Sequence, residues 1–356
     1  MENRMKFIHT ADLHLESRMA SSFSASLASE RRRELLLTFG RLFSYAEENG
    51  VEGILIAGDL FDSGRVPART VNDVLGVLKA HPHVQVYYLC GNHDENNLSK
   101  LSALPENCHA FSKGWTSYTL GGVNLVGTED FTDERAADLT LPETGKNIVL
   151  LHGQVADKNG SFQIALSSLR GKHIDYLALG HLHSYREGKL DERGVYAYPG
   201  CLEGRGFDEC GEKGFLLLDV GETIERTFVP FASLTLHEAE VALTAEDTGI
   251  FEVEAKIDRA LCSIPSSDMV KIVFRGDRNP DLSFDLSYFE QRYRPNFRFV
   301  KVEDKTRLAV FADDFKGDIS LKGEFVRLVR ASKLSEEEQD DILECGIRAL
   351  RGEADL

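Results

Sequence analysis

The chain has 356 residues, of which 42% are hydrophobic, and it carries a formal net charge of -17 at pH 7. This length supports a large domain plus a smaller one, and the sequence has no run of about 18 uncharged apolar residues that would span a membrane. The acidity excludes a protein that binds nucleic acid over its whole surface, because phosphates would be repelled, but local binding stays open.

The start of the chain and its cysteines both favour a cytoplasmic protein. The opening residues, MENRMKFIHTADLHL, enter an apolar run directly and contain no signal-peptide core. No C-x-x-C pair occurs, so we expect reduced thiols rather than disulfides or zinc ligands. The cysteines are Cys90, Cys108, Cys201, Cys210, Cys262 and Cys345.

Short apolar runs in the first half each lead into a polar motif, and we expect them to be buried strands. They are Phe7 to Thr10, Ile54 to Ala57, Val84 to Leu89, Ile148 to Leu151 and Tyr176 to Leu179. Helical patterns lie between them at about 29–49, closed by Gly50, and at 67–80, with Pro67 near the start. Strands that end in polar motifs, with helices packed outside, predict an α/β fold, a layered β-sandwich flanked by helices.

Three consecutive arginines, Arg31, Arg32 and Arg33, lie within the first helical pattern. Glu30 and Glu34 flank them, which favours an exposed helix face of mixed charge over contacts with phosphate. The three side chains are therefore expected to face solvent.

Beyond Gly180 the pattern changes to short strands joined by Gly-rich turns, at 195–198, 215–220 and 225–231. We therefore place the end of the first domain near Ser233, which gives a domain of residues 1–233. A small α+β domain, 234–315, is expected next, with strands at 250–257, 269–274 and 298–302 and a helix at 286–293. Residues 316–356 are expected to form a C-terminal helical segment.

The last helix is predicted from the residues at its ends. Ser335 and Glu338 form a capping box, Arg348 and Arg351 lie in the last turn, and Gly352 closes the helix. Its apolar side chains suit docking on another surface, and we favour a surface of the protein itself. These side chains are Ile342, Leu343, Ile347 and Leu350.

Five polar motifs follow the predicted strands: HTADLHL at 9–15, GDLFD at 58–62, GNHD at 91–94, LLHG at 150–153 and GHLH at 180–183. They supply carboxylates, imidazoles and an amide oxygen, the donors that a pair of divalent cations needs. These donors are Asp12, His14, Asp59, Asn92, His152, His181 and His183. Each motif alone has a plain explanation as a turn, but the five in order predict a two-metal site. His9, inside the first strand, is expected to be structural or to support a ligand.

The motif order D-x-H, G-D, G-N-H, H and G-H-x-H resembles that of the calcineurin-like metallophosphoesterase superfamily. Within it, the forms HTADLHL, GDLFDSG and GNHD, and the loop YPGCLEGRGFDECGEKGF at 198–215, resemble SbcD-like, YhaO-type DNA-repair exonucleases. Glu203 stands where that group often carries Gln, and Cys201 where the SbcD form usually has Ser. The resemblance covers nearly the whole chain and is weaker through the small domain.

The resemblance implies that two metal ions, both manganese, bind at this site. One ion would be held by Asp12, His14, Asp59 and His183 and the other by Asp59, Asn92, His152 and His181, with Asp59 as the bridge. His93 would stabilise the phosphoryl charge or protonate the leaving oxygen, and Asp62 would orient His93.

The function that this resemblance implies is a manganese-dependent DNA phosphodiesterase, an exonuclease or endonuclease of SbcD-like type that acts in DNA repair. Water activated by the two metals would attack the phosphodiester. The implied macromolecular partners are DNA and a SbcC-like coiled-coil ATPase, and a homodimer is left open.

A basic stretch in the small domain suggests how an acidic protein holds DNA. Basic and aromatic residues alternate between Lys271 and Arg307, which suits contact with phosphates and bases, and we single out Arg292, Arg294 and Arg298. Acidic residues lie among them, so a solvated surface of mixed charge is an equal alternative.

Two other functions stay open. One is a phosphatase or cyclic-nucleotide phosphodiesterase of the same fold. Two observations speak against this function. Phosphoprotein phosphatases have an arginine after the aspartate that corresponds to Asp62, whereas this chain has Ser63, and the added domain would have no obvious use in a phosphatase. The other is a non-catalytic scaffold, and the full ligand set, with Asn92 and His93, speaks against that.

Overall fold

The computed structural model describes residues 4–19, 23–63, 65–94, 98, 102–279, 282, 284–309 and 317–350. The chain forms two compact units, Met1–Thr235 and Leu236–Leu356. The division of the second part into a small domain, 234–315, and a C-terminal helical segment, 316–356, stays a prediction. None of the helices within the described part of the chain is long and apolar enough to cross a membrane. No disulfide joins any of the six cysteines, all of which are described.

Two six-stranded sheets form the first unit, and the five predicted strands are all present. The first sheet has the order β14-β13-β1-β2-β3-β4. Its strands are β1 Met5–Thr10, β2 Gly53–Ala57, β3 Gln85–Leu89, β4 Cys108–Ala110, β13 Gly214–Val220 and β14 Ile224–Pro230. The four strands β1 to β4 are parallel, whereas β13 and β14 are antiparallel to their neighbours. The carboxyl ends of the parallel strands therefore meet at one edge.

The second sheet repeats this arrangement with the order β11-β12-β10-β7-β6-β5. Its strands are β5 Thr116–Leu120, β6 Val123–Gly127, β7 Lys146–His152, β10 Tyr176–Gly180, β11 Arg186–Lys189 and β12 Val195–Tyr198. The inner strands β6, β7, β10 and β12 are parallel. A two-stranded ribbon, β8 Gln154–Ala156 with β9 Gln163–Ala165, follows β7 directly.

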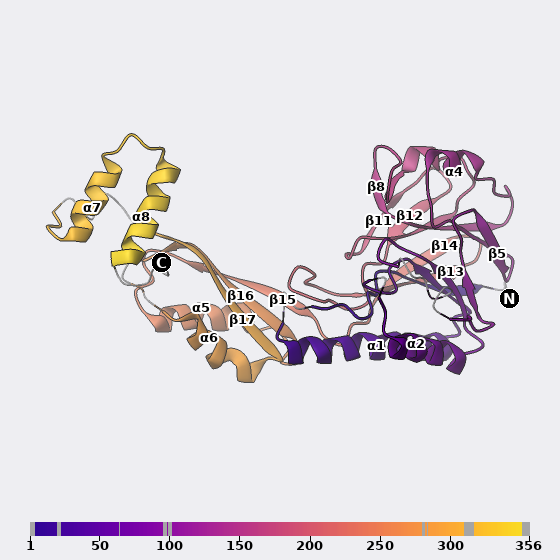
Figure 1. Ribbon diagram of the computed structural model, residues 1–356, viewed down its shortest axis with the longest axis horizontal. Helices are drawn as coiled ribbons and strands as arrows, with labels where there is room; N and C mark the ends of the chain where they lie inside the picture. Colours follow the sequence, from indigo (N-terminus) through magenta and orange to yellow (C-terminus); the bar gives the residue numbers. More distant parts are fainter. Residues whose placement is uncertain are drawn as a thin grey trace. The chain divides into compact units, whose positions relative to one another are not determined.

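The core lies between the two sheets, so their inner faces carry wholly buried apolar side chains. Phe7, Leu55 and Leu89 come from the first sheet, and Leu150 and Ala178 come from the second. Helices cover the outside: α1 Ala25–Glu48, α2 Ala68–Ala80, the short α4 Asp133–Asp138 and the 3-10 turn η1 Leu166–Ser168. Within this unit α1 and α2 lie together on one side and α4 on the opposite side (Figure 1). The predicted α/β sandwich flanked by helices is confirmed.

The prediction that all three arginines of α1 face solvent is wrong for Arg31. Its side chain is fully buried, and its guanidinium donates to the Glu203 carboxylate at 3.0 Å and to the Gly204 carbonyl at 2.9 Å. Thr38 of α1 donates to the same carboxylate at 2.6 Å. The pattern of flanking glutamates is local and holds no information about Glu203, which is far away in the chain. Arg31 therefore ties α1 to the loop that follows β12.

The second unit is a three-stranded parallel sheet with two crossover helices. The strands are β15 Leu236–Leu243, β16 Met269–Arg278 and β17 Phe299–Leu308, and the helices are α5 Ile250–Leu261 and α6 Leu286–Tyr293, followed by the 3-10 turn η2 Arg294–Asn296. Parallel neighbours require such crossovers. In this unit α5 and α6 lie side by side along one face of the sheet (Figure 1).

The predicted strand at 250–257 is wrong, because this segment begins α5. Glu252 accepts the backbone N–H of Gly249 and thereby caps the first turn. Val253, Ile257 and Leu261, spaced by four residues, form the buried face of the helix. The strand of this part of the chain lies earlier, at 236–243, where alternate residues are buried.

The chain continues into a pair of helices, α7 Leu321–Arg330 and α8 Glu336–Leu350. Val326 and Val329 of α7 pack against Leu343 and Ile347 of α8. The predicted docking of α8 on the protein itself is therefore confirmed for these two residues, whereas Ile342 and Leu350 are exposed. The predicted capping box is present, since Glu338 accepts the N–H of Ser335. Arg351 and Gly352 lie outside the described residues.

Candidate metal centre

All seven predicted ligands lie where parallel strands end at one edge of the first unit. Asp12 and His14 follow β1, Asp59 follows β2, Asn92 follows β3, His152 ends β7, and His181 and His183 follow β10. Four of them have positive φ angles, namely Asp12 (53°), His14 (45°), Asp59 (52°) and His181 (108°). Because this backbone region is strained for any residue with a side chain, the surrounding structure must hold these turns in place. Such strain is typical of functional sites.

The donor atoms of these side chains converge. Asp59 Oδ2 lies 3.3 Å from His152 Nε2 and 3.8 Å from His14 Nε2. Asn92 Oδ1 lies 3.0 Å from the same His152 nitrogen, and the Nε2 atoms of His14 and His183 are 3.2 Å apart. Two acceptor nitrogens or oxygens this close repel one another unless positive charge lies between them. The chemistry and convergence of the donors therefore fit divalent cations.

Three-residue groups with ligand atoms mutually within 4.8 Å can be recognised in the described part of the chain. They are Asp12, His14 and His183; Asp12, Asp59 and His152; and His14, Asp62 and His93. The first two overlap at Asp12, so they form one continuous cluster with room for more than one ion.

Burial perturbs the titration of this cluster. Desolvation raises the pKa of Asp12 to about 6, although the nearby His152 and His183 oppose the rise. Burial likewise lowers the pKa of His14 to about 4. For His152 the attraction of Asp59 and Asp12 outweighs the effect of burial and raises the pKa, so this imidazole attracts a proton. A site where carboxylates draw positive charge into a buried space is suited to hold a metal ion there.

Hydrogen bonds from the backbone fix several ligands. The carbonyl oxygen of Ala57 accepts at 2.9 Å from Nδ1 of His152, which leaves the Nε2 lone pair directed at the cluster. The N–H of His181 donates to both oxygens of Asp12, at 3.0 and 2.9 Å. Gly58 is required beside them, because a Cβ there would lie 2.1 Å from His152 Nδ1. The strands and turns thus preorganise the donors.

Two residues that the sequence analysis assigned no role, Arg205 and Glu209, support the cluster from the loop after β12. Glu209 Oε1 lies 2.7 Å from Nδ1 of His183, and the guanidinium of Arg205 binds Glu209 and, at 2.9 Å, Asp62 Oδ1. Arg205 also lies 3.0 Å from His183 Nδ1, but it has no acceptor, so the Nδ1–H donates to Glu209. This sets the tautomer in which His183 Nε2 faces the cluster. Although burial opposes ionisation, bonds from His183 and Arg205 hold the pKa of Glu209 well below its usual range.

Asp94, the last residue of GNHD, organises the loops rather than the donors. Its buried carboxylate accepts the backbone N–H groups of Leu60 (3.1 Å), Phe61 (2.9 Å) and Gly91 (3.2 Å). It thereby joins the loop that carries Asp59 to the loop that carries Asn92 and His93. Burial raises the pKa of Asp94 to about 6. Only its place in the motif pointed to this residue, since its partners are backbone groups.

A sequence profile described as calcineurin-like phosphoesterase matches residues 5–185, which contain all seven predicted ligands. The chain belongs to this family. The uncharacterized metallophosphoesterase YhaO of Bacillus subtilis is 27% identical over 61% of this chain and 57% of its own length. The DNA double-strand break repair protein Mre11 of Sulfurisphaera tokodaii is 28% identical over 53% of this chain and 51% of its own length. The chain thus spans little more than half of each of these relatives.

A solved structure, TT1561 of Thermus thermophilus, aligns with 63% of this chain and 98% of its own length, with a TM-score of 0.44 and 14% identity. The calcineurin-like phosphoesterase family accounts for the two-sheet architecture of the first unit. It also accounts for the cluster of carboxylates and imidazoles at the strand ends.

Beside this phosphoesterase centre, the side chains of His93 and Asp62 differ from the predicted arrangement. His93 Nδ1 faces the backbone carbonyl of Asp62 at 3.1 Å, so the expected orientation by this residue comes from its backbone. The Asp62 carboxylate instead contacts His14 Nδ1 at 3.2 Å and Arg205. His93 is exposed, while its backbone N–H donates to Asp59 Oδ1 at 2.9 Å. His93 is therefore the imidazole of the cluster that is most open to a substrate.

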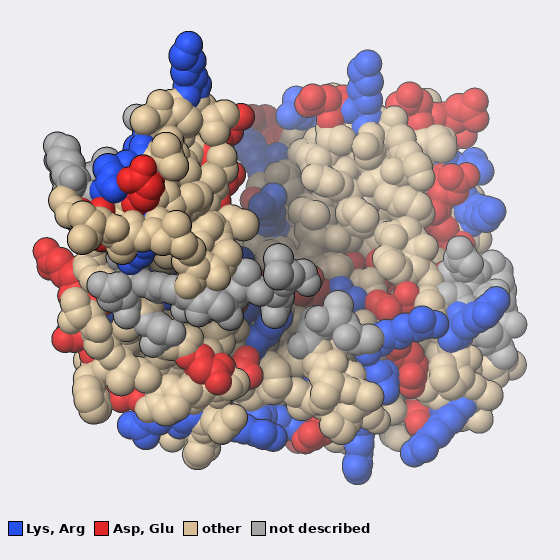
Figure 2. Space-filling model, turned by 60° about the vertical axis from the view of Figure 1, so that its left-hand side comes forward, with Lys and Arg blue, Asp and Glu red and all other residues tan. Residues whose placement is uncertain are grey.

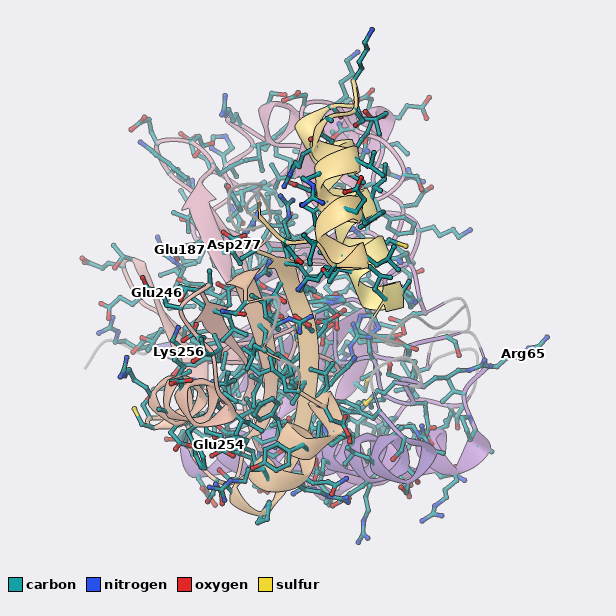
Figure 3. All side chains as sticks on the ribbon, turned by 90° about the vertical axis from the view of Figure 1, so that its left-hand side faces the viewer. Arg65, Glu187, Glu246, Glu254, Lys256 and Asp277 are labelled. Carbon is teal, nitrogen blue, oxygen red and sulfur yellow. The ribbon has the colours of Figure 1, made fainter. Side chains whose placement is uncertain are left out.

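The predicted DNA contacts lie in the second unit, apart from the residues of the phosphoesterase centre in the chain. Arg292 is 3.5 Å from Glu254, Arg294 caps α6, and the backbone N–H of Arg298 donates to Asp268. Figure 3 labels Glu254 on α5.

Much of the basic stretch around these arginines is ion-paired, for example Lys271 with Glu238 and Arg275 with Glu240. The charges of the face drawn in Figure 2 are correspondingly mixed. These contacts favour the alternative of a mixed-charge surface for the ion-paired residues, and the role of Arg292, Arg294 and Arg298 stays a prediction.

Proposed function

We propose that this protein is a metal-dependent phosphodiesterase that hydrolyses DNA, with manganese at both positions of the centre. The observation that carries the proposal is the convergence of Asp59 and Asn92 oxygens on His152 Nε2, at 3.3 and 3.0 Å, next to an exposed His93. The similarity to proteins named as DNA double-strand break repair proteins supports DNA as the substrate class. Because the chain spans only part of these relatives, their activity is carried over here as a proposal.

In this proposal the seven ligands divide as the family resemblance implies. Asp12, His14, Asp59 and His183 would hold one ion, and Asp59, Asn92, His152 and His181 would hold the other. Two bound cations supply positive charge for the phosphate oxygens and lower the pKa of a water. Imidazole and carboxylate donors together suit manganese better than magnesium.

The protein's own groups then do the rest of the chemistry. The imidazole of His93 lies beside the cluster, with Nδ1 3.1 Å from the carbonyl that orients it, and would stabilise the phosphoryl charge or protonate the leaving oxygen of the phosphodiester. Glu209 and Arg205 keep His183 in its tautomer, and Asp94 keeps the loops of Asp59 and His93 in register. The proposal also includes action in DNA repair, a SbcC-like ATPase partner and a cytoplasmic location, and a homodimer stays open.

Activity on a matched pair of substrates tests the proposal. The chelated protein is reconstituted with manganese, magnesium or zinc and assayed on a phosphodiester reporter, a phosphomonoester reporter and end-labelled DNA. We expect cleavage of the diester and of DNA with manganese, and little with magnesium. Preference for the monoester would favour a phosphatase, and inactivity with every metal would favour a scaffold. Full activity after exhaustive chelation would contradict the two-metal site.

Two substitutions separate metal binding from proton transfer. Asp59→Asn removes the bridging charge, so both metal content and activity should fall. His93→Gln should keep the metals and lose most of the turnover, because the imidazole is not needed as a ligand. Metal content is measured by elemental analysis after dialysis. An equal loss of metal in both variants would show that this division of roles is wrong.

A further inference from the structure

A pocket opens beside the metal centre and shares His152 with it. Its volume is about 300 Å³, at the lower end of the range for small-molecule sites. One wall is the segment 128–132 after β6, which includes Phe131, and the other is the segment 160–164 that leads into β9. Since both walls and the shared histidine belong to the first unit, a group in this pocket lies next to a phosphate at the metal centre.

Phe162 on the wall of this pocket is held in an unusual conformation. Its φ angle is 53°, so the backbone of this bulky residue adopts the left-handed conformation. Seven other described non-glycine residues have a positive φ angle, and four of them are candidate ligands. Phe162 remains 39% exposed, and its ring lies edge-on to that of His152, with ring centroids 6.1 Å apart. An exposed aromatic ring in strained backbone beside a metal ligand is a mark of function rather than of core packing.

The neighbouring backbone keeps Phe162 in this place. The N–H of Gln154 donates to the Phe162 carbonyl at 2.8 Å, and β8 pairs with β9 immediately beyond it. Gly153, which follows the ligand His152, has a φ of 156°, and a Cβ there would come within 2.7 Å of the Phe162 carbonyl oxygen. The ribbon is thus fixed directly to the end of the strand that carries the ligand. The position of Phe162 is set by the metal centre's own scaffold.

The charges of the pocket indicate which chemical group it binds. Glu129 and Asp130 on its wall would repel a phosphate, so the anionic part of a substrate belongs at the metals instead. The wall also carries the neutral polar side chains of Ser161 and Gln163. An exposed aromatic ring, the exposed carboxylate of Asp130 and neutral polar groups together suit a flat, uncharged ligand with N–H donors. A nucleobase with an exocyclic amino group has this chemistry.

We propose that this pocket binds the unpaired base of a nucleotide adjoining the scissile phosphodiester, with the base stacked on Phe162. The proposal rests on the proposed function and adds a subsite to it. A base inside a duplex is stacked and paired and cannot enter, so the subsite selects single-stranded or frayed ends. Base stacking on aromatic side chains tolerates different bases, so this subsite reads the presence of a base and its amino group more than its full identity.

The experiment compares single-stranded oligonucleotides that each contain a single cleavable phosphodiester. This linkage lies at the 5′ end in one set of strands and at the 3′ end in another. In one strand of each set the bases are intact, and in two others the base on the 5′ or the 3′ side of that linkage is missing. With wild-type protein, loss of the base on one of the two sides should raise KM about tenfold, and kcat should change less. Phe162→Ala should raise KM for the intact strand by a similar factor and leave the corresponding abasic strand unchanged. Phe162→Tyr should keep the wild-type preference.

A binding measurement provides a readout that needs no turnover. Metal-stripped protein is titrated with strands that carry 2-aminopurine at either position, whose fluorescence is quenched by stacking. Wild-type protein should quench it, and Phe162→Ala should not. Phe251→Ala removes the same atoms from an exposed phenylalanine of the second unit and serves as the control. Circular dichroism verifies folding, and the comparison of strands on wild-type protein decides the question without any variant.

The outcomes distinguish this inference from the proposed function. If wild-type protein with manganese cleaves none of the strands, the proposed function fails, and the fluorescence titration still decides whether the pocket binds a base. If all strands are cleaved with the same KM and Phe162→Ala changes neither KM nor quenching, the pocket inference is overturned while the nuclease activity stands.

Discussion

Replacement of Glu209 by glutamine should weaken metal binding without removing any metal ligand. The Glu209 carboxylate is buried, accepts the Nδ1–H of His183 at 2.7 Å and binds Arg205. Glutamine keeps the size and one acceptor oxygen but loses the charge that makes the imidazole a better donor to a metal. Loss of such an outer partner typically costs 10- to 100-fold in metal affinity, or roughly 1.4 to 2.7 kcal/mol. We expect about tenfold for Glu209→Gln, because the tautomer is retained, and a larger loss for Glu209→Ala.

Calorimetric titration of the chelated protein with manganese measures this effect at pH 7.5. The pKa of Glu209 is depressed, so its contribution is present above the usual pKa of about 4.3 and is lost only as the pH falls below it. Glu187→Gln is the matched control, because Glu187 binds Arg226 at 3.0 Å in the same unit and is labelled in Figure 3. Affinity of Glu209→Gln within twofold of wild type would refute the role assigned to this carboxylate.

Three further predictions follow from buried or charged groups. The pKa of Asp94 is about 6 in the folded protein and about 3.9 in the unfolded chain, so between these pH values the folded metal-free protein binds more protons. Its stability should therefore fall as the pH rises from about 4 to 6, by at most about 3 kcal/mol. Asp94→Asn should flatten this slope in urea unfolding. Replacement of Arg292, Arg294 and Arg298 by alanine should weaken DNA binding and reduce its salt dependence, while a small phosphodiester is cleaved normally. Truncation after Ser332 should leave cleavage of small reporters intact but expose the apolar face of α7, lowering stability or partner binding.

Each of these predictions can fail in a specific way. An unchanged pH slope for the asparagine variant would mean that the Asp94 carboxylate is not protonated in this range. Normal binding of DNA by the triple variant across a salt titration would assign DNA contact to the first unit or to a partner. A truncated chain with the unfolding midpoint and partner binding of the full chain would leave α8 without the role assigned to it.

The sequence was most informative where structure is determined locally. A run of apolar residues that ends in a polar motif identifies a parallel strand and its ligand, so the places of Asp12, Asp59 and His152 at the sheet edge were predictable. The segment 250–257 was mistaken for a strand because Ile, Phe and Val favour strands. A helix forms there because Glu252 caps its first turn and because two parallel strands need a crossover connection between them.

Contacts between distant parts of the chain could not be predicted in this way. The burial of Arg31 depends on Glu203, and the support of His183 depends on Arg205 and Glu209, all in a loop whose shape is set by its neighbours. The sequence of that loop resembles a known family, but no periodicity or spacing in it shows which side chain contacts a metal-binding residue. Phe162 lies in a segment that has no motif at all.

The order of strands in the first sheet has a consequence for how the protein is made. The first strand, β1, pairs on one side with β13, so Met5 lies opposite Val220. Asp12 and His14, which follow β1, lie beside candidate ligands from distant parts of the chain, such as Asp59 and His183. Contacts between such distant residues form late, after the loop-closure cost has been met. A chain still on the ribosome that ends before residue 209 lacks β13, one of the two neighbours of β1, and also lacks Glu209, which supports His183. The seven candidate ligands, the last of which is His183, are therefore made before the residues that complete their support, and we expect the site to reach its final geometry only when the first unit is complete.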